Sequence, residues 1–197
     1  MKKSKQEQII EKATELFFAK GISDTNMDEI AACVPVSKMT IYKYFNSKEK
    51  LLSDVLDRYI RSIHRDMTRK IKENPDPLTA LMSIMDYEAI QFPEVFFREM
   101  FESYPNLIAQ MMEYYEKKIA GEFEQLIFDA QRKGQIRKEI SPHILLLYIN
   151  GLKEHFAKPQ VIRGLGDLKS VGEQVKTIML YGIVTPENQP KNSSEGI

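Results

Sequence analysis

One segment of the sequence concentrates side chains that can bind a nucleic acid. It runs from Lys38 to Phe45, and its outward-facing candidates are Lys38, Met39, Thr40, Tyr42 and Lys43. On a helix, Ile41 and Phe45 lie about one turn apart and would face inward together. The ammonium and hydroxyl groups would then face outward, where they can bond phosphate oxygens and base edges.

The other polar residues do not form the pattern of an enzyme's active site. The three histidines, His64, His143 and His155, are too far apart along the chain for a metal-ligand motif. The sequence contains no GxSxG, HExxH, P-loop or CxxC motif, and the pair Gly164 and Gly166 is too short for a dinucleotide signature. We therefore expect no enzymatic activity, no cofactor and no metal site.

The segment that carries these residues is predicted to be the second helix of a helix-turn-helix. Asn26 can cap a first short helix over Met27–Cys33, and Ser37 can cap the second. Pro35 disfavours helical geometry at the residue before it, so a turn of about four residues separates the helices. Apolar stripes on either side can support this small unit: Ile9, Ala13, Leu16 and Phe17 before it, and Leu51, Leu52 and Val55 after it.

Helical periodicity continues through most of the remaining sequence, and no segment has the alternating pattern of a strand. Further helices are predicted over residues 48–71, 78–92, 94–104, 106–133, 142–158 and 167–183. Residues 185–197 are rich in Pro, Asn and Ser, a composition typical of a disordered tail. The expected fold class is therefore all-α.

At this point the N-terminal part of the chain resembles the TetR family of bacterial transcriptional regulators. The matching residues, in family order and spacing, are Ile10, Ala13, Leu16, Phe17, Gly21, Thr25, Ile30, Ala31, 36–45 and 47–52. The resemblance implies a three-helix DNA-binding domain at residues 1–47. It also implies a helical ligand-binding and dimerisation domain at residues 48–184, joined to the first by a long fourth helix from Lys48.

The resemblance assigns DNA contacts to particular residues of this chain. Backbone N–H groups of Thr25 and Asn26 would hold a phosphate. Base edges or nearby phosphates would be contacted by Lys38, Met39, Thr40 and Lys43. Phosphates would also be contacted by Tyr42 and Lys48, and Ser37 completes the predicted DNA-binding set.

The sequence departs from the family pattern at two positions of the motif. Pro35 stands where the turn usually has Gly, and Met39 stands where the second helix usually has a small residue. Proline cannot adopt a left-handed conformation, so we expect a turn that is reshaped but still forms the motif. Met39 could contact a thymine methyl group. We expect Tyr44 to pack against the first or fourth helix.

The central part of the chain is rich in aromatic residues and methionine. The predicted ligand pocket consists of Phe92, Phe96, Phe97, Met100, Phe101, Tyr104, Met111, Met112, Tyr115 and Phe123. Such side chains suit a pocket for a small hydrophobic ligand, but on spacing alone a well-filled core remains the alternative. The resemblance favours the pocket. Nearby Glu88, Glu99 and Glu102 could favour a cationic ligand, although a solvated face is the preferred interpretation.

The last two predicted helices each carry a wide apolar stripe. The predicted dimer-interface residues are Leu145, Tyr148, Ile149, Leu152, Val171, Val175, Ile178 and Met179. Helices that are apolar over more than one face need more burial than one chain usually supplies. Two copies would give a homodimer with two-fold symmetry and two reading helices.

Composition is compatible with this interpretation. The 197 residues carry no formal net charge, but residues 1–70 contain 14 basic and 10 acidic side chains. A basic front is weak support for a polyanionic partner. The single cysteine, Cys33, cannot form an internal disulfide, and we expect it to be a small core residue. The longest strongly apolar run, residues 144–149, is too short to span a membrane, and we expect a cytoplasmic protein.

The sequence thus predicts a ligand-responsive regulator of transcription, a repressor rather than an activator. As a homodimer it would bind palindromic double-stranded DNA and be released by an unidentified small hydrophobic molecule, with no membrane contact. An alternative is a helical carrier of a hydrophobic ligand that does not bind DNA. Salt-dependent binding to duplex DNA separates the two interpretations.

Overall fold

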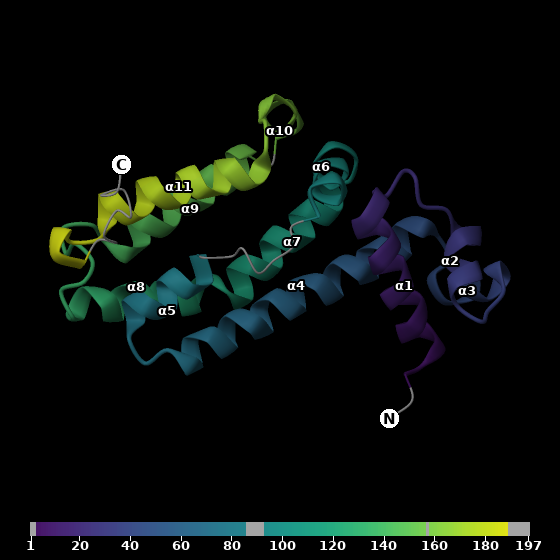
Figure 1. Ribbon diagram of the computed structural model, residues 1–197, viewed down its shortest axis with the longest axis horizontal. Coiled ribbons are helices and arrows are strands. Elements are labelled where there is room, and N and C mark those ends of the chain that lie inside the picture. The colour runs from purple at the N-terminus through teal and green to yellow at the C-terminus, as the bar shows by residue number, and fades with distance from the viewer. Residues whose placement is uncertain (1–2, 86–92, 157, 189–197) are drawn as a thin grey trace, which may run out of the picture. The chain divides into compact units, whose positions relative to one another are not determined.

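The structure is a computed structural model that describes residues 3–85, 93–156 and 158–188 (Figure 1). The predicted all-α fold is confirmed, because 80% of the described residues are helical and none of them forms a strand. The helices are α1 (Lys5–Lys20), α2 (Met27–Cys33), α3 (Lys38–Phe45), α4 (Lys48–Glu73), α5 (Pro77–Met85), α6 (Glu94–Ser103), α7 (Pro105–Lys118), α8 (Ala120–Arg132), α9 (Pro142–Phe156), α10 (Pro159–Gly164) and α11 (Leu168–Ile183), with a 3-10 turn at Pro186–Asn188.

Side-chain caps set the ends of the first three helices. Ser4 and Glu7 form a capping box at the start of α1, each side chain accepting a hydrogen bond from the other's backbone N–H. The helix ends at Gly21, whose φ of +95° favours glycine. Asn26 and Ser37 each accept a hydrogen bond from the backbone N–H three residues further on. The predicted starts of α2 and α3 are therefore confirmed.

Internal contacts divide the chain into two compact units, Met1–Arg65 with Gln91–Tyr114, and Asp66–Ile90 with Tyr115–Ile197. Fully buried side chains of the first unit include Ile9, Ala13, Phe17, Ile30, Ile41, Phe45, Leu51, Leu52 and Val55. The core of the second unit includes Leu78, Leu81, Leu126, Ile127, Leu145, Ile149, Met179 and Ile183. The predicted functional domains, 1–47 and 48–184, stay a prediction.

The helices of the second half differ from the predicted ones at two points. The single helix predicted over residues 106–133 is wrong, because a turn at Ile119 separates α7 from α8, although the φ of −112° and ψ of −42° at Ile119 stay in the right-handed helical region. Gly121, a poor helix former, follows the break. The predicted link before the last helix contains α10, which begins at a proline, a residue suited to the first helical turn.

Two predicted segments extend beyond the described residues. The helix predicted over 78–92 is described as far as Met85, and residues 86–92 lie outside the described part of the chain. The tail predicted at 185–197 begins with the short 3-10 turn, and residues 189–197 lie outside the described part as well.

Cys33 lies at the end of α2 and is exposed, so the expectation that it is a core residue is wrong. Met27, Ile30 and Val34 take the inward positions of this segment instead. None of the helices in the described ranges is long and apolar enough to cross a membrane.

Candidate nucleic-acid interface

The two sides of α3 differ sharply in exposure. Ile41 and Phe45 are fully buried, which confirms the predicted inward pair. On the other side, 81% of Met39 and 41% of Tyr42 are exposed. We call the exposed side chains Lys38, Met39, Tyr42 and Lys43 the α3 face. A helix held by two buried residues can present this face to a groove of DNA while the rest of the first unit supports it.

The turn between α2 and α3 contains the proline that departs from the family pattern. The Val36 N–H donates to the Val34 carbonyl at 2.6 Å, which closes a three-residue turn around Pro35. Such a turn requires a φ near −75° at its centre, and proline is fixed close to that value. The predicted helix-turn-helix is therefore present, with a turn that proline can form, and no residue from Val34 to Ser37 has a positive φ.

Hydroxyl groups at the start of α3 bond to one another. Ser37 Oγ accepts from the Thr40 N–H at 3.2 Å, and the two side-chain oxygens lie 2.9 Å apart. Ser37 is exposed and Thr40 is half-buried. These capping bonds therefore orient the hydroxyl groups of Ser37 and Thr40, both predicted to contact DNA, at the N-terminal end of α3.

Lys38 forms an ion pair with a carboxylate of α2. Its Nζ lies 2.6 Å from Asp28 Oδ2, and the two side chains remain 47% and 68% exposed. The hydrogen bond to Asp28 raises the pKa of the Lys38 ammonium above its usual value. A phosphate or base that bonds Lys38 must therefore compete with Asp28, although solvent screening makes an exposed pair of this kind weak.

Of the two residues predicted to hold a phosphate at α2, only Asn26 is exposed. Thr25 is fully buried, and its Oγ1 donates to the Gly21 carbonyl at 2.7 Å. Its backbone N–H donates to the Ile22 carbonyl at 3.3 Å. In this structure Thr25 therefore fixes the turn between α1 and α2.

Lys48, the first residue of α4, is half-buried. Burial lowers the pKa of its ammonium, while the carboxylates of Glu99 and Asp24 act in the opposite direction. Glu99 lies on α6 and accepts hydrogen bonds from the backbone N–H groups of Ile22 and Ser23. The sequence analysis placed Glu99 on a solvated face and did not predict this role. No local signal could have found it, because Glu99 is 77 residues from Ile22.

Tyr44 is a second residue whose position the sequence analysis did not anticipate. It is 44% exposed, although it was expected to pack against α1 or α4. The ring centroid of Tyr44 lies 6.2 Å from that of Phe45, so one side of the Tyr44 ring lies beside this buried residue of α3. The available signal was the spacing from Ile41, which puts Tyr44 at the margin of the buried side rather than within it.

The predicted pocket residues are distributed over both compact units. Phe96, Phe97 and Met100 of α6 are buried in the first unit, where Phe101, Tyr104, Met111 and Met112 are half-buried. Tyr115 and Phe123 are half-buried in the second unit. Phe92 lies outside the described residues. The Phe97 ring centroid lies 5.4 Å from that of Phe96 and 6.3 Å from that of Phe101, so α6 carries an aromatic cluster. The pocket itself stays a prediction.

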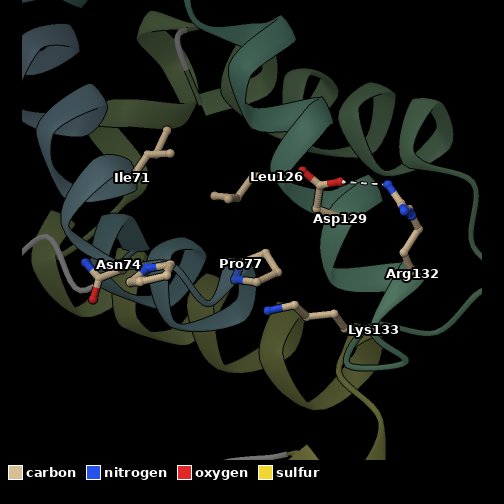
Figure 2. A pocket seen from close by; sticks show the side chains of 8 residues that line it. Ile71, Asn74, Pro77, Leu126, Asp129, Arg132 and Lys133 are labelled. Atoms are coloured by element: carbon tan, nitrogen blue, oxygen red, sulfur yellow. Dashed lines mark ion pairs between the residues drawn. The ribbon is translucent and has the colours of Figure 1, made fainter.

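The second unit contains a cleft of about 500 Å³, lined by Ile71, Asn74, Pro75, Pro77, Leu126, Asp129, Arg132 and Lys133. Figure 2 shows the side chains that line it. None of these residues belongs to the predicted pocket. Arg132 pairs with Asp129 at 3.9 Å, and Lys133 pairs with Asp76 at 3.3 Å. Hydrogen bonds lower the pKa of Asp76 to about 2, the largest contribution being that from the Thr79 N–H. Among the described residues, no group of three His, Cys, Asp or Glu side chains could hold a metal ion.

The predicted dimer residues divide between the interior and the surface of the second unit. Leu145, Ile149 and Met179 are buried in the core of their own chain, so they have little surface left for a partner. Leu152, Val171 and Val175 are half-buried. Among the described side chains of α9 and α11, the large apolar ones that are exposed are Ile144 (57%), Leu147 (54%), Tyr148 (48%), Ile178 (62%) and Tyr181 (36%). We call these five residues the α9/α11 apolar face; of them, the predicted set of dimer-interface residues included Tyr148 and Ile178.

Comparison with known proteins identifies the helix-turn-helix region. Residues 9–55 match the family model described as bacterial regulatory proteins, tetR family. The chain is 27% identical over 176 residues to the HTH-type transcriptional repressor SCO4008 of Streptomyces coelicolor, and the alignment covers 84% of this chain and 86% of that protein.

Solved structures share the fold across nearly the whole chain. A TetR transcription regulator from Haloarcula marismortui has a TM-score of 0.71 at 14% identity, covering 92% of this chain and 98% of its own. A transcriptional regulator from Saccharomonospora viridis, in complex with choline, has a TM-score of 0.70 at 17% identity, covering 91% and 97%. The relatives are transcriptional regulators rather than enzymes. Residues 9–55 therefore form a DNA-binding region of the tetR type, and the chain shares its overall fold with these transcriptional regulators.

Proposed function

We propose that the protein is a homodimeric repressor that binds a palindromic operator with α3 in the major groove. The observation that carries the proposal is the two-sidedness of α3, in which Ile41 and Phe45 are fully buried while Met39 is 81% exposed. Lys38, Tyr42 and Lys43 surround Met39 with groups that bond phosphates and base edges. The contact with DNA would be completed by Asn26, Ser37, Thr40 and Lys48. Thr25 would not contact DNA itself but would hold the turn between α1 and α2 in place.

The dimer is proposed to form through the α9/α11 apolar face. A single α3 contacts too few base pairs for specific recognition, whereas two copies about 34 Å apart reach successive major grooves. Large apolar side chains exposed on a soluble chain favour association, and a two-fold axis lets each copy present the same face to the other. The repeat in the operator would mirror that axis.

A small, largely hydrophobic molecule is proposed to weaken DNA binding. The aromatic and methionine residues of α6 and α7 would contact it, and α4, whose first residue is Lys48, would connect the ligand-binding domain at 48–184 with the DNA-binding domain at 1–47. The choline bound to the S. viridis relative supports a small organic effector for this fold. Coupling of about 1–3 kcal/mol, usual for allosteric proteins, would lower DNA affinity by roughly 5–150-fold.

Selection of bound duplexes from a random pool, followed by sequencing, tests the DNA-binding proposal. The expected product is an inverted repeat, bound with an affinity that falls steeply as salt rises. A selected sequence without a repeat would contradict dimeric readout. No binding to any duplex would favour the carrier interpretation. Thermal-shift measurements with hydrophobic compounds, and with choline as a cationic probe, then test the effector proposal.

A further inference from the structure

Glu99 of α6 contacts the turn that leads into the helix-turn-helix. Its carboxylate accepts hydrogen bonds from the backbone N–H groups of Ile22 and Ser23, the latter at 3.2 Å to Oε2. These N–H groups follow the end of α1, so they need acceptors outside a helix. Bonds from N–H groups to a carboxylate are among the stronger ones in proteins, and Glu99 makes them from a distant part of the sequence.

The end of α1 fits closely against α6. A Cβ atom on Gly21 would lie 2.9 Å from Glu99 Oε2 and 2.9 Å from Val95 Cγ1, closer than real Cβ atoms approach. Gly21 also has a φ of +95°, which a residue with a side chain rarely adopts. Further back on α1, Phe18 packs on Phe96 with ring centroids 4.8 Å apart. The turn is therefore held against α6 by apolar packing and by the carboxylate.

The same turn sets the start of α2. The Gly21 carbonyl accepts from Thr25 Oγ1 at 2.7 Å, and the Ile22 carbonyl accepts from the Thr25 N–H at 3.3 Å. Lys48, which is predicted to contact a DNA phosphate, is also within the electrostatic influence of Glu99. A single carboxylate thus acts on the turn before α2 and on a predicted phosphate ligand.

We propose that Glu99 is a positioning residue for operator recognition, because it fixes the turn between α1 and α2 and thereby the orientation of α3. The proposal rests on the proposed DNA-binding function, and Glu99 does not itself contact DNA. Loss of the two hydrogen bonds lets α2 and α3 change orientation together. Base readout requires aligned side chains, whereas binding to arbitrary DNA depends mainly on charge. The affinity for the operator should therefore fall more than the affinity for unrelated DNA.

The test compares the full-length chain with the variants Glu99→Ala and Glu99→Gln in fluorescence anisotropy. Each protein is titrated onto the selected operator and onto an unrelated duplex of equal length at the same salt concentration. The ratio of the two affinities is expected to fall about tenfold in Glu99→Ala. It recovers partly in Glu99→Gln, whose amide oxygen can still accept a hydrogen bond. Glu102→Gln removes the same charge from an exposed position of α6 and should leave the ratio unchanged.

Amide hydrogen exchange at Ile22 and Ser23 provides the second readout. Both amides are expected to exchange faster in Glu99→Ala, with the helical content and melting temperature of the chain retained in Glu99→Gln. An unchanged affinity ratio in Glu99→Ala overturns the inference, and so does an equal loss on both duplexes in both variants. If the wild-type chain binds neither duplex, the proposed function itself fails, a result distinct from either of these.

Discussion

The α3 face and the α9/α11 apolar face both present large side chains to solvent, but their chemistry differs. The α3 face surrounds one methionine with two ammonium groups and the Tyr42 hydroxyl, and it belongs to the first compact unit. The α9/α11 apolar face has Ile144, Leu147 and Ile178 more than half exposed, and it belongs to the second. The α3 face is suited to a groove of DNA, and the α9/α11 apolar face is suited to another apolar protein surface. Under the proposed function, DNA recognition and dimerisation would therefore use two separate surfaces of the chain.

A charge placed in the α9/α11 apolar face should have the largest effect. Ile178→Glu is expected to weaken dimerisation by roughly 100-fold, because an unpaired charge in an apolar interface costs about 3 kcal/mol. Sedimentation velocity measures the dissociation constant. Phe128→Glu is the matched control, since Phe128 is 48% exposed but lies on α8. A dimer that survives Ile178→Glu and dissociates with Phe128→Glu would assign pairing to another surface.

Removing a cation from the α3 face should weaken binding to all DNA. Lys43→Ala is expected to lower affinity about tenfold for operator and unrelated duplex alike. The slope of log affinity against log salt should fall in magnitude by about 2, because each of the two chains in the dimer releases one fewer counterion. Lys133→Ala makes the same charge change in the second unit and should leave the slope as it was. A normal salt slope in Lys43→Ala would remove Lys43 from the DNA contact.

Met39→Ala should alter sequence preference rather than general affinity. Loss of an apolar contact with a base is expected to reduce operator affinity about fivefold, with little change on an unrelated duplex. Repeating the random-pool selection with the variant checks this, since one base pair in each half-site should become less selective. Unaltered selectivity at every position would mean that Met39 does not contact a base.

Asp28→Asn should give the smallest effect, and in the opposite direction. Lys38 would lose its ion-pair partner and become available to DNA, which should tighten binding by about two- to threefold. The pKa of the Lys38 ammonium should fall back towards its usual value, measurable by NMR, because the bond to Asp28 is the main cause of its rise. Asp57→Asn, which breaks the Arg61 pair on α4, is the control. Weaker binding in Asp28→Asn would show that Asp28 positions Lys38 for DNA.

The helix-turn-helix was predictable from the sequence because its determinants are local. Asn26 and Ser37 cap their helices through backbone groups three residues away. Pro35 fixes the turn through its own backbone geometry. The spacing of Ile41 and Phe45 alone sets which side of α3 is buried. Exposure of the α3 face follows from those five residues.

The rest of the site depends on contacts between distant residues. The stripe on α9 is wider than one helix face, so its sequence could not show that Leu145 and Ile149 face the core while Ile144 and Leu147 face solvent. Glutamate is usually a surface residue, so the sequence gives no sign of the bonds that Glu99 makes. These bonds to the turn after α1 form only once α6 packs against α1. The break at Ile119 likewise interrupts a periodic pattern that continues across it.

The stoichiometry of the complex on operators with altered half-site spacing tests the central claim most directly. Sedimentation or native mass measurement should find two chains on each inverted repeat. Insertion of about five base pairs between the half-sites should abolish tight binding, because it turns the second major groove to the opposite side of the duplex. A single chain on each duplex, bound equally well at every spacing, would contradict the account.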